Sequence, residues 1–276
     1  MLPPIDVGGY CVNQKMIDYL MALHQPPHAS NLGCMIALEI AKPLNIPAYI
    51  YDAISACALP LEATITGFKE FRKSTFCHVL NSRAAAIKYA EDNKKSYNDI
   101  SVVVAHLGGG ISVSAHTGGK IAEVAGDDDG SFSPERSGGA PLIPVVNLCF
   151  DKKFTRNEIL KKIRGEGGLK ALLGTTDLIE VEKAVNAGDE ESTLVYNAMV
   201  LQISKAIGSV SASIRGNVEA VILTGGMAHS QMLTDKIKEY VSFIAPVKVF
   251  PGENELSALA LGGLRILKGE ESAKEF

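Results

Sequence analysis

Two glycine-rich turns are the segments of this sequence best suited to bind an anion. They are HLGGGIS at 106–112 and LTGG at 223–226. Glycine has no Cβ, so the backbone N–H groups of such a turn can approach a phosphate closely. A tight hairpin turn needs one or two glycines, and the three in the first turn leave a wider loop that can wrap an anion. Taken alone, that turn still favours a structural interpretation slightly.

The predicted strands around the two turns narrow the kind of site they can form. The first turn lies between strands at 101–106 and 111–116, whereas a Walker loop and a dinucleotide fingerprint both need a helix after their glycines. The second ends a strand at 219–226 and opens a helix, a position that ligands favour in open α/β sheets. A plain strand–helix connection explains it equally well. Two such turns on either side of an amphipathic helix at 189–214 favour nucleotide binding.

Three further side chains lie where a substrate could be held. Arg136, in PERSGG, can donate paired hydrogen bonds to a phosphate or carboxylate, although an arginine in such a loop more often makes a surface ion pair. His78 lies near the start of a predicted helix and is either a catalyst or a capping or packing residue. Asp52 ends the strand predicted at 46–51, which suits a metal-binding or positioning carboxylate.

Other polar stretches are open to two interpretations. The acidic run at 127–129 is most simply a solvated loop, and Mg²⁺ binding is the weaker alternative. His28 and Asn31, in HASNLG, form a polar entrance to a predicted helix. Glu253 and Glu255, in PGENEL, can act as ligands or can simply stabilise the dipole at the start of the last helix.

Hydrophobic periodicity predicts an α/β protein. Helical spacing occurs at 13–23, 30–42, 78–93, 140–149, 155–164, 177–186, 189–214, 230–243 and from about 254. Strand patterns occur at 46–53, 101–106, 111–116, 120–125, 219–226 and 246–250. The polar stretch at 91–99 is the predicted domain boundary.

Composition excludes several classes of function. The 276 residues suit one large or two ordinary domains, and the net charge of -4 argues against a general nucleic-acid or membrane surface. Five cysteines without a CxxC pair favour a reducing cytoplasm over a disulfide framework or zinc site. The sequence has no signal-peptide pattern at its start and no apolar run of about 18 residues, so we expect a cytoplasmic protein.

The chain resembles the butyrate-type branch of the acetate and butyrate kinase family, within the acetate/sugar kinase–Hsp70–actin superfamily. The H-L-G-x-G-x-S pattern at 106–112 is a specific signature of that family. The resemblance covers essentially the whole chain and rests on the stretches HASNLG, VVVAHLGGGIS, GSFSPERSGG, LTGG and PGENELSALALGGLR.

This resemblance implies two ribonuclease-H-like, actin-like ATPase domains around a cleft. Residues 1–98 would be the remainder of a first, acyl-substrate domain that is N-terminally incomplete. Residues 99–253 would be the nucleotide-binding domain, and 254–276 a C-terminal helix that packs back on the first domain. The implied reaction is direct in-line transfer from ATP to butanoate, giving ADP and butanoyl phosphate, with Mg²⁺ as cofactor. Isobutyrate is the alternative acceptor, and a homo-oligomer, dimer or larger, is implied.

The resemblance also implies roles for individual residues. His78 would contact the transferring phosphoryl group, Arg136 would hold the carboxyl or phosphoryl group, and Asp52 would lie near the metal. Glu255, or less surely Glu253, would be a carboxylate near Mg²⁺. His28 and Asn31 would lie on the substrate side. The nucleotide would be bound by His106, Gly108, Gly109, Gly110, Ser112, Thr224, Gly225 and Gly226.

The sequence departs from the family pattern at its start and at two cysteines. It contains neither the N-P-G-S-T-like phosphate loop nor the later arginine–glycine stretch with which the family opens. Cys34 stands where a glycine is usual, and Cys77 replaces an aromatic residue before His78. From the missing loop we expect weak or no kinase activity from residues 1–276. A non-catalytic remnant that binds nucleotide is therefore the alternative function.

Overall fold

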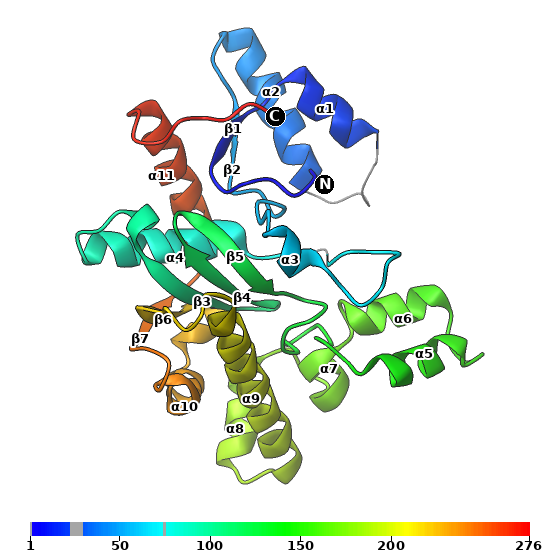
Figure 1. The fold of residues 1–276 in the computed structure, drawn as a ribbon. Helices are drawn as coiled ribbons and strands as arrows, with labels where there is room; N and C mark the ends of the chain where they lie inside the picture. Colours follow the sequence, from blue (N-terminus) through cyan, green and yellow to red (C-terminus); the bar gives the residue numbers. More distant parts are fainter. Residues whose placement is uncertain (1, 23–29, 74–75) are drawn as a thin grey trace.

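A five-stranded sheet forms the centre of the molecule, and a two-stranded sheet lies beside it (Figure 1). The structure is a computed structural model and describes residues 2–22, 30–73 and 76–276. Helices cover both faces of the larger sheet (Figure 1). Within these ranges no helix is long and apolar enough to cross a membrane.

The larger sheet joins an antiparallel meander to two parallel strands. Its strands lie in the order β5 (Lys120–Ala125), β4 (Ile111–Thr117), β3 (Ser101–Leu107), β6 (Ala220–Gly225) and β7 (Val247–Pro251). β3, β4 and β5 pair antiparallel, whereas β6 pairs parallel to both β3 and β7. All five strands were predicted. Because β3 and β6 run parallel, their carboxyl ends, and the two glycine turns that follow them, lie at the same edge of the sheet.

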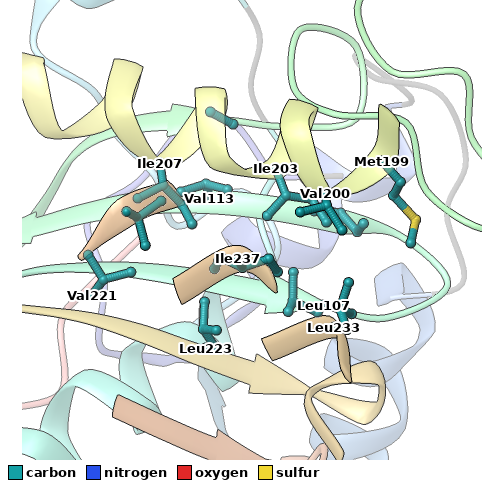
Figure 2. Packing of buried hydrophobic residues seen from close by; sticks show 14 of the residues in the cluster. Leu107, Val113, Met199, Val200, Ile203, Ile207, Val221, Leu223, Leu233 and Ile237 are labelled. Atoms are coloured by element: carbon teal, nitrogen blue, oxygen red, sulfur yellow. The ribbon is translucent and has the colours of Figure 1, made fainter. Parts of the chain in front are cut away.

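One face of the larger sheet packs against α9 (Glu190–Ser213) and α10 (Gln231–Val241). Figure 2 shows Ile203 and Ile207 of α9 lying over strand residues that include Val113 and Val221. The predicted apolar stripe of α9 is confirmed, since its central residues are fully buried.

The opposite face of the sheet is covered by α4 (Val79–Asp92). Ala86 and Ala90 are fully buried against Val102 and Val104. Alanine side chains are short, so the helix lies close to the strands. This contact places the N-terminal end of α4, and His78 just before it, beside the first glycine turn.

The smaller sheet pairs β1 (Gly9–Cys11) with β2 (Tyr49–Tyr51), and α1 (Gln14–Met21), α2 (Ser30–Leu44) and α11 (Glu255–Leu267) pack around it. The buried strand predicted at 46–53 is wrong in length and burial, because only three residues pair and two of them are half-buried. The left-handed backbone of Asn45 and Asp52, with φ of 51° and 46°, bounds the segment. β1 was not predicted.

Four other helices and a short 3-10 turn complete the second half: α5 (Leu142–Phe150), α6 (Arg156–Ile163), α7 (Gly168–Leu173), α8 (Leu178–Asn186) and η2 (Gly226–His229). A capping box of Thr155 and Glu158 begins α6. The short helices α3 (Leu61–Thr64) and α7, of four and six residues, and the 3-10 turn η1 (Tyr97–Asp99) were not predicted, because so few residues do not show an apolar period.

Substitutions at Ile203 and Leu201 test how much the buried face of α9 contributes to stability. Ile203→Ala leaves a cavity among fully buried side chains, so we expect the free energy of unfolding to fall by about 2–5 kcal/mol. Leu201 is 43% exposed on the same helix, and Leu201→Ala is the matched control, with an expected change within about 0.5 kcal/mol. Urea denaturation measures both, and equal losses would contradict the packing described.

Candidate active site

Two stacked histidine rings form the centre of the candidate site. His78 lies at the N-cap of α4 and His106 near the end of β3. Their ring centroids are 3.9 Å apart and the ring planes differ by 9°. Ser112 faces His106 across the β3–β4 hairpin, and its Oγ lies 2.9 Å from Nδ1 of His78. The sequence therefore identified three residues that the fold brings together.

Both histidines are neutral at physiological pH. The pKa of His78 is lowered to about 4, mainly by burial; the negative charge of Asp127 acts in the opposite direction, and the positive charge of Arg136 adds a smaller lowering. Burial, with smaller contributions from His78 and Arg136, lowers the pKa of His106 to about 3. Neutral imidazoles act here as hydrogen-bonding groups rather than as positive charges.

Asn81 joins this cluster and was missed at the sequence level. Its side-chain amide donates to Nδ1 of His106, at 2.8 Å, and to Oγ1 of Thr224, at 3.3 Å. Asn81 is buried and follows His78 by three residues, so both lie on the same side of α4. That spacing is the signal by which the sequence could have revealed it.

Arg136 reaches the first glycine turn from the loop after β5. Its guanidinium fills the space into which a side chain at residue 110 would project. It also pairs with the buried carboxylate of Asp127, within the run predicted to be a solvated loop. That interpretation is wrong for Asp127, because its side chain is buried. The positive charge of Arg136 offsets the free-energy cost of burying its carboxylate. Ser133 Oγ donates to the carbonyl of Gly109 at 2.7 Å and links the same loop to the turn.

Glu253 lies at the mouth of the same turn. Its Oε1 is 3.4 Å from Nε2 of His106, and the side chain is 46% exposed. Glu255 is the exposed first residue of α11. Of the two carboxylates considered from the sequence, Glu253 is the one whose contact with the histidine pair is established.

The second glycine turn passes directly against the first. Gly225 has a φ of 92°, and a Cβ at this position would overlap the backbone of Leu107. Thr224 pairs with His106 in the parallel β3–β6 register. A cavity of about 520 Å³ is lined by residues of both turns, Gly109 and Gly226 among them, and by the start of α8. The side chains of Thr224 and Ser112 are buried beneath the turns and bonded to Asn81 and His78.

Asp52 lies in a different environment, a buried ion pair. Its carboxylate accepts from Nη1 of Arg83 at 3.1 Å and from the backbone N–H of Gly8 at 2.7 Å. Arg83 also donates to Glu271, in the C-terminal segment. Burial alone would lower the pKa of Arg83, but Asp52, Tyr51 and Glu271 raise it, so this arginine stays charged. The interactions of Asp52 thus link the small sheet to α4.

Of the substrate-side residues, Asn31 lies apart from the histidine pair. His28 is outside the described residues. Asn31 lines an apolar cavity of about 350 Å³ together with Tyr51 and Leu259, and its Oδ1 has no hydrogen-bond partner among the described residues. In the part of the chain that the structure describes, no group of three or more His, Cys, Asp or Glu side chains could hold a metal ion.

Comparison with known proteins identifies the family. The profile of the acetokinase family matches residues 77–249, which include both glycine turns and the histidine pair. Butyrate kinase 1 and butyrate kinase 2 of Clostridium acetobutylicum are each 46% identical over 278 aligned residues. Each alignment covers 100% of this chain and 78% of the relative.

The chain belongs to the acetokinase family. The crystal structure of Porphyromonas gingivalis acetate kinase superposes on this member of the family with a TM-score of 0.82 at 20% identity. The superposition covers 95% of this chain and 75% of that chain. The resemblance noted from the motifs is therefore confirmed, and so is the actin-like α/β fold.

Three buried histidines predict a loss of stability in mild acid. Burial lowers the pKa of His78 to about 4 and, with the charge of Arg83, that of His116 to about 3; His106 behaves similarly. The unfolded chain, with histidine pKa values near 6.5, binds more protons below that pH than the folded chain. The free energy of unfolding should therefore fall as the pH drops from about 6.5 to 4, by up to about 1.4 kcal/mol per pH unit for each histidine.

Urea denaturation at several pH values measures this slope. His116, which bonds to Tyr97 and Ser114, is the residue to replace, and His116→Gln should reduce the slope. His229→Gln, at an exposed position, should leave it unchanged. Stability that is constant from pH 6.5 to 4 would contradict neutral burial of these rings.

Proposed function

We propose that this chain transfers the γ-phosphoryl group of ATP to the carboxylate of butanoate, giving ADP and butanoyl phosphate. The observation that carries the proposal is the cavity bordered by both glycine turns, at the edge of the sheet where the histidines and Arg136 meet. The 46% identity to butyrate kinases along the whole chain supports this activity over a nucleotide-binding remnant. Isobutyrate or another short acid is the alternative acceptor.

The reaction needs alignment and charge neutralisation more than a general base. A carboxylate acceptor is already ionised, and the transferring phosphoryl group carries negative charge on its equatorial oxygens. Arg136 supplies a positive charge beside the first glycine turn, and the turn supplies backbone N–H groups. His78, neutral and next to Arg136, supplies a hydrogen-bond donor to the phosphoryl group.

Mg²⁺ is the proposed cofactor, and Glu253 is the residue that would hold it. Magnesium is commonly bound by one or two carboxylates together with the phosphates of the nucleotide, so a site with few protein ligands fits it. Glu253 is partly exposed and lies against the first turn, whereas Asp52 is engaged by Arg83. When bound, the ion would neutralise charge on the nucleotide phosphates.

We also propose a preference for the length of the acyl tail and an oligomeric state. Each methylene of the acyl tail that is buried contributes about 0.8 kcal/mol, so the preference for chain length should be modest. We propose a homo-oligomer, a dimer or larger, in the cytoplasm.

The test is ATP-dependent formation of acyl phosphate, trapped with hydroxylamine, by purified residues 1–276. Product that requires both Mg²⁺ and butanoate supports the proposal. Nucleotide binding without product, across butanoate, isobutyrate and acetate, would instead support the non-catalytic alternative considered from the sequence.

Arg136→Ala should separate catalysis from nucleotide binding. Loss of one preorganised charge next to the transferring group should lower kcat about 10²- to 10³-fold. The dissociation constant of MgADP, measured by calorimetry, should change little, because Arg136 is not among the residues that line the cavity bordered by the two glycine turns. Arg156→Ala, at an exposed position of α6, is the control. Equal loss of binding and turnover would show that Arg136 is a nucleotide or structural residue.

A further inference from the structure

Asn81 is buried beside the stacked histidines, and its amide contacts both His106 and Thr224. Building on the proposed function, we propose that Asn81 is a positioning residue that keeps His106 in the tautomer with its proton on Nε2. The ring then presents an N–H donor at the mouth of the first glycine turn.

The direction of the hydrogen bonds around Asn81 carries this inference. The hydroxyl of Thr224 donates to the carbonyl of Gly252, at 3.5 Å, and therefore offers a lone pair to Asn81. The group of Asn81 that faces Thr224 must then be its NH₂. The same NH₂ lies 2.8 Å from Nδ1 of His106, so Nδ1 must accept and cannot carry the proton.

The far side of the ring gives the same answer independently. Nε2 of His106 lies 3.4 Å from the carboxylate oxygen of Glu253, which can only accept when ionised. In the opposite tautomer, the N–H on Nδ1 would face the NH₂ group of Asn81. The lone pair on Nε2 would then face a lone pair of the Glu253 carboxylate. The neutral ring therefore has one tautomer that satisfies both neighbours.

The first glycine of the first turn, Gly108, makes this orientation relevant to the reaction. A Cβ on Gly108 would lie 2.8 Å from the Glu253 carboxylate and 3.0 Å from Nε2 of His106, so a glycine here leaves the Nε2–H accessible to the turn. A phosphate oxygen bound at the turn would meet a donor in this tautomer and a repelling lone pair in the other. Asn81 thus acts on the phosphate through His106.

Packing and strand pairing fix the position of the Asn81 side chain. Asn81 is buried on the first turn of α4, whose alanines pack on β3 and β6. Thr224 and His106 are paired in the sheet register, so one amide group bonds to both strands at once. His78 stacks on a face of the His106 ring and limits its rotation.

Nitrogen NMR of the histidine side chains, in protein labelled with ¹⁵N, tests the proposal without a turnover assay. In the wild-type protein, Nδ1 of His106 should have the shift of an unprotonated nitrogen and Nε2 that of a protonated one. Asn81→Asp replaces the donor by an acceptor of nearly the same shape, so Nδ1 of His106 should become protonated. Asn81→Leu removes the donor and should give a mixture of the two tautomers.

Kinetics of the same variants test the consequence. Asn81→Asp should lower kcat by about 10- to 100-fold, the usual effect of losing a residue that orients a functional histidine, with a smaller change in MgADP affinity. Asn93→Asp makes the same chemical change at the end of the same helix and should alter neither the tautomer nor kcat.

A wild-type His106 protonated on Nδ1, or an Asn81→Asp variant in which Nδ1 stays unprotonated, would overturn the proposal. An unchanged kcat in a variant whose tautomer has switched would overturn the link to catalysis. A protein that has the expected tautomer but forms no acyl phosphate would contradict the proposed function and not the role of Asn81.

Discussion

The parallel pairing of β3 with β6 is the contact on which the candidate site depends. It sets the ends of two strands that are more than a hundred residues apart side by side, with His106 opposite Thr224. Immediately beyond this pair the two glycine turns touch, because Gly225 lies against the backbone of Leu107 where no larger residue fits. The cavity bordered by both turns is a consequence of this register, since a shift of one residue would turn His106 to the other face.

Two further contacts attach functional groups to this edge. The packing of α4 on β3 and β6 delivers His78 and Asn81 to the side of His106. The loop after β5 is held against the first turn by the Arg136 guanidinium, which pairs with Asp127 in the same loop, and by the hydrogen bond from Ser133 to Gly109. A second buried ion pair, between Arg83 and Asp52, connects α4 to the small sheet. Removal of one partner from such a pair costs about 3–5 kcal/mol, so the Arg83 pair stabilises the junction between the two sheets.

Regular elements and local motifs were predictable from sequence, whereas contacts between distant residues were not. The meander and the stripe of α9 follow from alternation and from helical spacing. β1, only three residues long, has too few positions to show alternation. The motifs identified His78, His106 and Arg136, but the stacking of the two rings depends on how α4 packs on the sheet. Asp52 is an instructive case, because its position after a strand suggested a metal ligand, and its partner Arg83 lies 31 residues further along.

We propose above all that the two glycine turns form one nucleotide site. Titration of ¹⁵N-labelled protein with MgADP, followed through the backbone amide signals, tests it most directly. We predict that the amides of residues 108–110 and 224–226 shift together, with one dissociation constant. Shifts confined to one turn, or centred on α5 and α6 instead, would contradict a shared site.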